Sequence, residues 1–268
     1  MGRLKRVLGA VALVCLCAAA AWGGGRIRLA TTTSTENSGL LAAILPVFER
    51  TSGYRVDVIA VGTGQALRLG RGCDVDVVLV HAPALEKAFV AQGWGVRREG
   101  VMYNYFAIVG PPSDPAGIKG LSPVEAMKRI AETKAMFVSR GDNSGTHVKE
   151  LSLWKAAGIK PKGRWYREAG AGMGAVLRMA SELGAYTLTD TGTFYKYRCA
   201  GRLNLVALVA GGQALRNPYH IIAINPAKCP GVNSAGAEAL IKFMTSRKGK
   251  RLIANYRACG HKLFWPLP

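Results

Sequence analysis

The chain has 268 residues, of which 49% are hydrophobic and 19% charged, and its formal net charge is +20. A chain of this length can form one large domain or two small ones, each with a buried core. The basic residues lie in short scattered groups (RLGR, KGRWYR, YKYR, SRKGKR), which indicates a solvated surface rather than a nucleic-acid interface. The positive charge favours the capture of an anion, whose selectivity must come from a specific site.

The first 21 residues have the composition of an export signal. Basic residues at positions 3, 5 and 6 precede the apolar segment Val7–Cys17, and the small residues Ala18–Ala21 follow it. The apolar run is shorter than the roughly 20 residues that a membrane span requires, and no later segment is apolar enough to span. We therefore expect residues 1–21 to be a cleaved signal peptide, which leaves a mature chain of charge +17 in the periplasm or another extracytoplasmic compartment.

Beyond the signal, short apolar runs alternate with helical patterns, which predicts a layered α/β architecture. The strands are predicted at Arg26–Ala30, Arg55–Val61, Val75–Val80, Phe106–Val109, Met136–Val138, Leu205–Val209 and His220–Ile224. The helices are predicted to begin near Ser38, at Ser122, at Ser144, and before Val176 and Leu240. The start at Ser122 is well defined, because Glu125 completes a capping box. Gly249 is predicted to interrupt the last helical region.

Two segments break this pattern, Gly110–Pro115 and Gly211–Pro218. Glycine and proline in such segments favour turns over regular structure. Two breaks fit a chain that begins one lobe, crosses to a second lobe and returns. We therefore predict a discontinuous first lobe, residues 22–108 and 218–268, and a second lobe, residues 109–217.

Four cysteines remain after signal cleavage: Cys73, Cys199, Cys229 and Cys259. An even number in an exported protein suggests disulfides, with three possible pairings, and four buried thiols are the alternative. We expect Cys229 to pair with Cys259, because these two bracket one helical segment. None has the spacing of a zinc site, so we expect no bound metal cation.

Four segments rich in glycine and small hydroxyl residues stand between a predicted strand and a predicted helix. They are Thr31–Thr35, Gly62–Gln65, Ser139–His147 and Gly170–Gly174, and Thr187–Thr191 follows the helix after the last one. Helix N-termini attract anions through unpaired N–H groups, and glycine lets an anion approach the backbone. Ordinary N-capping explains any single segment. Four segments that converge at the carboxyl ends of strands predict an anion site.

Arg140 adds a full positive charge to the third segment. Its planar guanidinium can hold two oxygens of one tetrahedral anion, and Asp142 could fix its orientation. The alternative is a surface ion pair, which contributes at most about 1 kcal/mol.

His81 lies where the strand Val75–Val80 ends, close to the expected site. An anion that still carries a proton needs an acceptor, and a histidine is a poorer acceptor than a carboxylate would be at this position. His81 therefore favours a fully deprotonated dianion, and the alternative is a core or rim histidine bonded to the backbone.

Three segments, Thr31–Ser34, Ser139–His147 and Tyr186–Asp190, together resemble the tungstate-binding proteins of ABC importers, over essentially the whole mature chain. The Arg-Gly-Asp-x-Ser-Gly-Thr-His run is the most specific of them. It also resembles the Arg-Ser-Asp-x-Ser-Gly-Thr loop of the related phosphate-binding proteins, which have an aspartate where this chain has His81. The family often has a basic residue where this chain has Thr191.

The resemblance implies which residues hold the ligand. Carried over residue by residue, the loop implies Arg140, Ser144, Gly145 and Thr146. From the first lobe, the resemblance implies Thr32, Thr33, Ser34 and Thr63. The segment around Asp190 adds Thr189 and Thr191.

The resemblance also implies a type II periplasmic-binding fold, with two α/β lobes joined by a two-crossing hinge and the ligand in the cleft. The implied function is that of an extracytoplasmic solute-binding protein that captures a tetrahedral oxyanion, tungstate, and delivers it to the membrane permease of an ABC importer. We expect a monomer that binds no nucleic acid and uses no cofactor. Its ligand, tungstate or molybdate, would be bound through its oxygens.

Two alternatives stay open. Molybdate or phosphate binding on the same fold is the nearer one, since tungstate and molybdate have the same charge and shape. A hydrolase is the other, because Ser144, Asp142 and a histidine occur close together. The chain lacks a Gly-x-Ser-x-Gly elbow, and Asp142 is only two residues from the serine that it would support, so we expect no enzyme activity.

Overall fold

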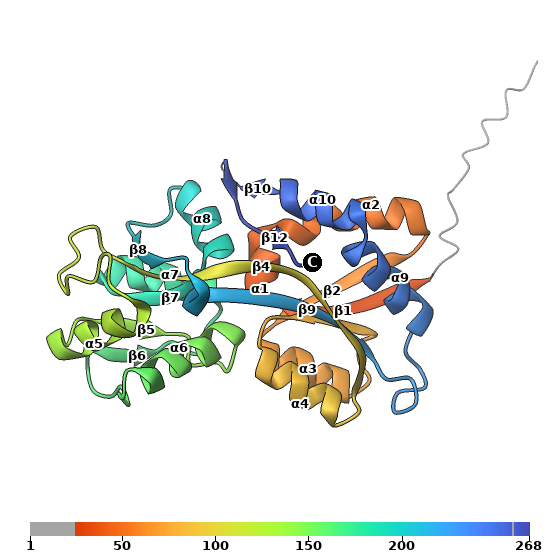
Figure 1. Cartoon of the computed structure of the whole chain (residues 1–268), viewed down its shortest axis with the longest axis horizontal. Coiled ribbons are helices and arrows are strands. Elements are labelled where there is room, and N and C mark those ends of the chain that lie inside the picture. The colour runs from red at the N-terminus through yellow and green to blue at the C-terminus, as the bar shows by residue number, and fades with distance from the viewer. Residues whose placement is uncertain (1–24, 259) are drawn as a thin grey trace, which may run out of the picture.

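The structure, a computed structural model, describes residues 25–258 and 260–268. The predicted signal peptide, residues 1–21, lies outside these residues. Two bodies lie side by side along the long axis of the molecule, and two long strands, β4 and β9, run from one to the other (Figure 1). None of the helices in the described part of the chain is long and apolar enough to cross a membrane.

The strands are β1 (Arg26–Thr32), β2 (Arg55–Val61), β3 (Val77–Val80), β4 (Gly95–Gly110), β5 (Phe137–Ser139), β6 (Tyr166–Glu168), β7 (Thr187–Asp190), β8 (Val206–Ala210), β9 (Arg216–Ile224), β10 (Arg257–Ala258), β11 (His261–Lys262) and β12 (Trp265–Pro266). The helices are α1 (Thr33–Ser38), α2 (Leu40–Ser52), α3 (Thr63–Arg71), α4 (Pro83–Ala91), α5 (Pro123–Thr133), α6 (Gly145–Ala156), α7 (Met173–Leu183), α8 (Thr191–Cys199), α9 (Ser234–Thr245) and α10 (Arg247–Asn255), with a 3₁₀ turn at Gln213–Leu215.

The sheet of the first body has the strand order β12–β4–β9–β3–β1–β2. β1 is parallel to β2 and β3, whereas β9 is antiparallel to β3 and β4. All four residues of β3 are buried, as expected for a strand that helices cover on both faces. Alternate residues of β3 enter two cores: Val77 and Leu79 pack with α2 and α9, and Val78 and Val80 pack with α3 and α4.

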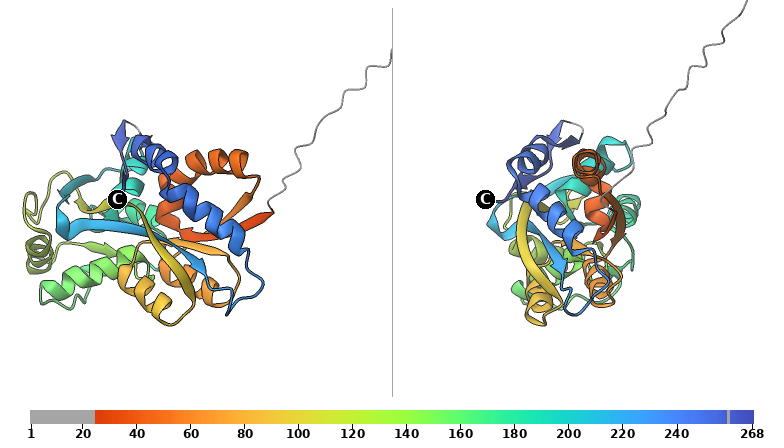
Figure 2. Two further views of the ribbon diagram at one scale, coloured as in Figure 1. Left: turned by 45° about the vertical axis from the view of Figure 1, so that its right-hand side comes forward. Right: turned by 90° about the vertical axis from the view of Figure 1, so that its right-hand side faces the viewer.

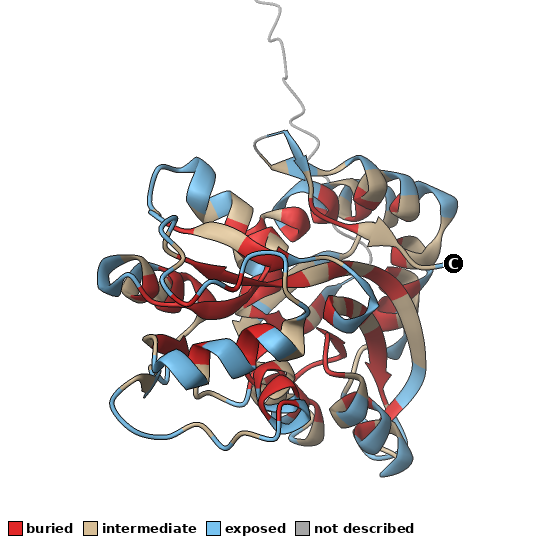
Figure 3. Ribbon diagram, turned by 60° about the vertical axis from the view of Figure 1, so that its left-hand side comes forward, coloured by how far each residue is buried: buried red, intermediate tan, exposed pale blue. Residues whose placement is uncertain are grey.

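The second body is built on the far end of β4. β7 and β8 pair with that end, and β5 pairs in parallel with β6. The side chains of Phe106 and Ile108 pack with α5 and α6, whereas those of Ala107 and Val109 pack with α7 and α8. Figure 3 shows buried strands between helices whose outer faces are exposed.

β4 is one strand of 16 residues that belongs to both bodies. Residues 95–105 pair with β9, and residues 106–110 pair with β7 and β8. The cores change at the same place, since Met102 packs in the first body and Phe106 in the second. The return crossing shows the same change, because Leu215, just before β9, packs in the second body and Tyr219 of β9 in the first. The chain therefore crosses between the bodies along the antiparallel pair β4–β9, whose curvature Figure 2 shows.

All seven predicted strands are present, and β2 has the predicted bounds. β4 is the large difference, because it begins at Gly95 and only Phe106–Val109 was predicted. Charged residues such as Arg97, Arg98 and Glu99 interrupt its apolar pattern. The segment Gly110–Pro115 accordingly follows the crossing, which takes place inside a regular strand.

Two predicted helix starts are confirmed. Ser122 Oγ accepts from Glu125 N at 3.3 Å, and the Glu125 carboxylate accepts from Ser122 N at 3.1 Å, which is the predicted capping box of α5. Ser144 caps α6 through a hydrogen bond from His147 N.

The predicted interruption at Gly249 is wrong. The helices break at Ser246, whose hydroxyl caps α10 by accepting from Gly249 N at 3.1 Å. Gly249 lies inside α10, where a Cβ would come 2.1 Å from Phe243 O. This glycine permits close packing of α10 against the end of α9.

The predicted Cys229–Cys259 disulfide is also wrong, because Cys229 is bonded to Cys73. Cys259 lies outside the described residues. A disulfide needs Cα atoms within roughly 4.4–6.8 Å, and the Cα atoms of Cys73 and Cys229 are 5.3 Å apart. The fold places the end of α3 against the turn before α9, a proximity that sequence spacing does not reveal.

We predict that replacing both Cys73 and Cys229 by serine lowers the free energy of unfolding by about 2–5 kcal/mol, because the bond closes a long loop in the unfolded chain. Urea denaturation measures this loss. Peptide mapping without reductant should recover the Cys73 and Cys229 peptides joined to each other. A different partner for Cys229, or an unchanged unfolding free energy, would contradict this pairing.

Candidate functional site

Five helices begin where the two bodies meet. α1 and α3 follow β1 and β2 of the first body, and α6, α7 and α8 follow β5, β6 and β7 of the second. A helix N-terminus carries N–H groups without partners in the helix and a partial positive charge. The junction therefore collects positive ends from both bodies.

Direct contacts hold these helix ends together. Arg140 Nη1 donates to Ser34 Oγ at 3.5 Å, and Thr193 Oγ1 in α8 donates to Ser34 O at 3.3 Å. Gly62, just before α3, lies so close to the second body that a Cβ there would be 3.7 Å from Asp142 O. The threonine-rich loop and the Arg140 loop thus face one junction, as the sequence predicts.

Arg140 is buried, with 2% of its surface exposed, and hydrogen bonds hold its guanidinium in place. Its Nε donates to Ala171 O at 3.3 Å, and its Nη2 donates to Asp142 Oδ2. The other oxygen of Asp142 accepts from Ser144 N at 3.1 Å. The predicted orienting role of Asp142 is confirmed, and the alternative of a surface ion pair is wrong because the guanidinium is buried.

Three of the predicted ligand residues have buried hydroxyls without partners. The Oγ1 atoms of Thr33, Thr63 and Thr146 make no hydrogen bond within residues 25–258 and 260–268. Leaving a buried polar group unpaired costs about 1–3 kcal/mol, so most such groups are paired. Thr33 and Thr63 come from the first body and Thr146 from the second. These hydroxyls are the donors that an anion in the junction would satisfy.

Two other predicted residues also act as caps. Thr32 Oγ1 accepts from Thr35 N at 3.2 Å, and Ser144 Oγ accepts from His147 N at 3.2 Å. The hydrogen of the Ser144 hydroxyl stays available for a ligand, because capping uses only the oxygen. By contrast, α3 and α7 begin after Gly62 and Gly172, which have no side chain to cap them.

In the segment around Asp190, side-chain oxygens are already used in local hydrogen bonds. Thr189 Oγ1 donates to Asp190 O at 3.1 Å, so its hydrogen is already used. Thr191 is the half-buried first residue of α8. Asp190 caps α8 by accepting from Thr193 N at 2.8 Å, and its Oδ2 is buried with no partner within the described residues. The position of Asp190 before a helix could have indicated this cap from the sequence.

His81 is buried beside the junction. Its Nδ1 is 3.0 Å from Asn217 Oδ1, and its ring stacks on Tyr219 with centroids 4.6 Å apart. A Cβ on Gly145 would come 2.8 Å from the His81 ring, so only glycine fits there without movement. Burial lowers the pKa of His81, which keeps the ring neutral. The alternative interpretation from the sequence is a histidine bonded to the backbone. In the structure, His81 pairs instead with the side chain of Asn217 on β9.

Glu150 of α6 is hydrogen-bonded to Ser139, the residue before Arg140. Its carboxylate accepts from Ser139 Oγ at 2.8 Å, from Tyr166 OH at 2.8 Å and from Trp154 Nε1 at 3.1 Å. Burial raises the pKa of Glu150 to about 7. The sequence gives no signal for the role of Glu150, because polar and apolar residues are mixed along α6 without a clear apolar face.

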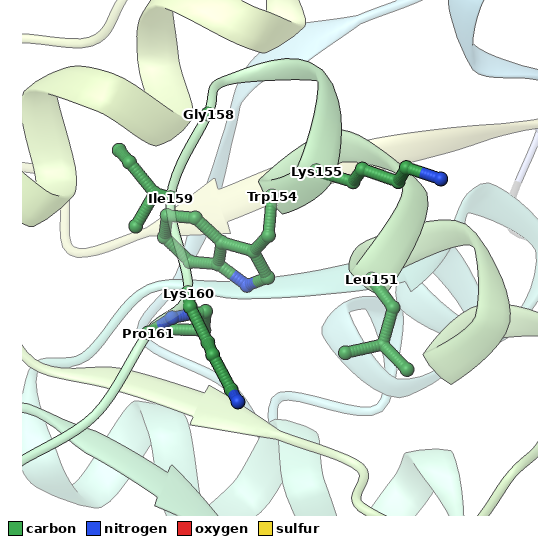
Figure 4. A pocket seen from close by; sticks show the side chains of 7 residues that line it. All are labelled: Leu151, Trp154, Lys155, Gly158, Ile159, Lys160 and Pro161. Carbon is green, nitrogen blue, oxygen red and sulfur yellow. The ribbon is translucent and has the colours of Figure 1, made fainter.

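Two of the hollows that α6 helps to line differ in their surroundings. One lies between the bodies and is lined by residues that include His81, Phe106, Gly145, Lys149 and Arg216. The other lies on the outer surface, with the Trp154 ring at its centre and the amino groups of Lys155 and Lys160 pointing away (Figure 4). The outer hollow contains none of the predicted ligand residues.

A family model described as a PBP superfamily domain matches residues 18–248. The chain is 49% identical to a putative ABC transporter anion-binding protein of Haloferax volcanii, over 90% of this chain and 71% of that protein. It is 47% identical to the tungstate-binding protein TupA of Peptoclostridium acidaminophilum, over 90% of this chain and 86% of that protein.

Solved structures have the same fold. The tungstate ABC transporter structure from Geobacter sulfurreducens superposes with a TM-score of 0.80 at 55% identity, covering 86% of this chain and 98% of that chain. The tungstate-binding protein TupA from Desulfovibrio alaskensis superposes with a TM-score of 0.78 at 45% identity, covering 91% and 99%.

We predict that Glu150 makes the stability of the protein depend on pH. The folded-state pKa of about 7 lies above the ordinary value of 4.5, so the folded chain binds the proton more tightly than the unfolded chain. Glu150 therefore costs stability as pH rises through 4.5 to about 7, by up to about 3 kcal/mol. Urea denaturation at pH 5 and pH 8 should show a smaller loss in Glu150→Gln than in the unmodified protein. An equal loss in both proteins would contradict this role.

Proposed function

The chain belongs to the PBP superfamily, in the family of the tungstate-binding proteins, and on this basis we propose that it captures tungstate and passes it to the permease of an ABC importer. Its fold is the predicted type II periplasmic-binding fold. The proposal depends on one observation: buried Arg140 and three buried hydroxyls that have no partner in the described part of the chain come from elements that end at the junction of the two bodies. The hydroxyls are those of Thr33, Thr63 and Thr146.

These groups suit a bare tetrahedral dianion. The guanidinium and the hydroxyls donate hydrogen bonds, and each bond to a charged group contributes about 1.5–3 kcal/mol. The Nη1 atom of Arg140 is the best placed for a ligand, because its hydrogen bond to Ser34 Oγ is long, at 3.5 Å. Nε and Nη2 are occupied by Ala171 O and Asp142, so they keep the guanidinium plane fixed.

We propose that residues of both bodies bind the ligand. Thr32, Thr33, Ser34 and Thr63 approach it from the first body, and Arg140, Ser144, Gly145 and Thr146 approach it from the second. Thr189 near the end of β7 and Thr191, the first residue of α8, complete the proposed set. Tungstate is cargo, and the protein requires no resident cofactor for this function.

We propose that the two bodies are the lobes expected from the sequence, and that closure of these lobes buries the ligand. We propose that residues 22–108 and 218–268 belong to the first lobe and residues 109–217 to the second. A change of core within β4 supports a division in this strand, and it falls slightly before the predicted bound, because Phe106 and Ile108 already pack in the second body. The hinge of the proposed lobes is the strand pair β4–β9.

The contacts of Ser144 favour binding over hydrolysis. Its hydroxyl accepts from a backbone N–H, and Asp142 bonds to Arg140 and to Ser144 N. The ring of His147 accepts from Asn143 N at 3.0 Å, so it is not placed to take a proton from the serine. The three residues build a loop for binding rather than a catalytic triad.

Export follows from the proposed signal peptide, residues 1–21. The mature protein would work as a monomer outside the cytoplasm, where its partners are the oxyanion and the membrane permease. Nucleic acid is not a partner in this setting.

We predict that micromolar tungstate raises the melting temperature of the mature protein, whereas equal sulfate or phosphate does not. Binding to the folded state alone stabilises it by about 2.7 kcal/mol at a ligand concentration of 100 times Kd. Arg140→Ala should abolish the shift and leave the unliganded melting temperature nearly unchanged. Competition between tungstate and molybdate, followed by titration calorimetry, gives their order. If Arg140→Ala keeps the full shift, the site is elsewhere.

We predict opposite effects for threonines with and without a hydroxyl partner. Thr63→Val and Thr146→Val remove unpartnered hydroxyls, so the unliganded protein should be as stable or slightly more stable, while tungstate affinity falls roughly tenfold. Thr31→Val is the matched control, because Thr31 Oγ1 donates to Leu79 O at 2.8 Å. It should lower stability and leave affinity unchanged. Calorimetric titration and thermal melting separate the two patterns, and a reversed pattern would remove these hydroxyls from the site.

A further inference from the structure

The loop from Arg140 to Ser144 has a backbone that needs external support. Gly141 and Asn143 have φ of 61° and 55°, in the left-handed region that most residues avoid. The peptide between Asp142 and Asn143 directs its carbonyl toward Gly62 of the first lobe, where a Cβ would be 3.7 Å away. Rotation of this peptide would move Asp142, whose two carboxylate oxygens orient Arg140 and Ser144.

The N–H end of the same peptide is held by His147. Asn143 N donates to His147 Nδ1 at 3.0 Å. A backbone N–H can only donate, so Nδ1 must carry the lone pair and the neutral ring must carry its proton on Nε2. The hydrogen bond therefore fixes the tautomer as well as the peptide.

The His147 ring is itself fixed in place. It is 6% exposed, and the backbone N of His147 donates to Ser144 Oγ in the first turn of α6. The charged groups around it are Asp142, Glu168 and Arg140, and burial lowers its pKa, so the ring is neutral. Nε2 is 4.0 Å from the largely exposed Glu168 carboxylate and makes no hydrogen bond within the described residues.

We propose that His147 is a positioning residue for oxyanion binding, which holds the Asp142–Asn143 peptide through Nδ1 and thereby keeps Arg140 and Ser144 aimed at the ligand. This inference rests on the proposed function. His147 does not touch the ligand in this scheme. It acts through the loop, so its acceptor atom matters and its charge does not.

Asparagine and glutamine substitutions separate the two ring nitrogens. The amide oxygen of asparagine can replace Nδ1 as acceptor, whereas the longer glutamine places its amide near Nε2. We expect His147→Asn to bind tungstate within about threefold of the unmodified protein. Outer groups that orient the residues around a bound ion typically matter 10–100-fold, so His147→Gln and His147→Ala should lose roughly tenfold or more. Glu168→Gln, which changes only the group facing Nε2, should have no effect.

Titration calorimetry measures the affinities, and the unliganded melting temperature shows whether each variant is folded. Equal affinity in all variants would overturn the proposal, and so would an asparagine variant that is folded yet as weak as the alanine variant. Two further measurements need no ligand. The ¹⁵N shifts of His147 should show the Nε2–H tautomer, and exchange of the Asn143 amide should be slow with His147 or Asn and fast with Gln or Ala. If the unmodified protein binds no oxyanion, the proposed function fails, and these two measurements still decide whether His147 holds the loop.

Discussion

The burial of a single guanidinium between two lobes sets the conditions for the rest of the site. A buried charge is costly unless it is paired and hydrogen-bonded. Here Asp142 and Ala171 O pair with one side of Arg140, and that pairing directs the remaining N–H toward the first lobe. The other site groups are neutral hydroxyls and backbone amides. In the proposed site, one fixed cation among neutral donors would select a dianion by hydrogen-bond geometry as much as by charge.

The shared strand β4 gives this geometry a mechanical basis. Its residues 95–105 are bonded to β9 and its residues 106–110 to β7 and β8, so both lobes are continuous with one backbone. Asn217 of β9 bonds to Asn104 of β4 at 2.8 Å and lies 3.0 Å from His81. The crossing is therefore tied to the end of β3 and, through His81, to Gly145 at the start of α6.

The sequence predicts the strands and helix starts that are determined by interactions between residues close in the chain. The β1 and β2 strands, the capping box at Ser122 and the loops after each strand follow from periodicity and capping preferences. The full length of β4 does not, because its solvent-facing charges hide the strand pattern. Gly249 is misleading for a related reason, since its small size serves packing against Phe243 and has no local signal. Cys73–Cys229, Glu150 and the His147–Asn143 bond depend on contacts that only the folded chain brings about.

The bond between Cys73 and Cys229 has a consequence for the order in which the molecule can come apart. The sheet of the first body is assembled from two stretches of chain, with the whole of the second body inserted between them. The sulfur bridge links these stretches outside the β4–β9 crossing, near α3 and α9. If the inserted body melts or is cut, the ends of the surrounding body stay tethered and need not find each other again. Both cysteines pack in the first body, so the bridge does not connect this body to the second one.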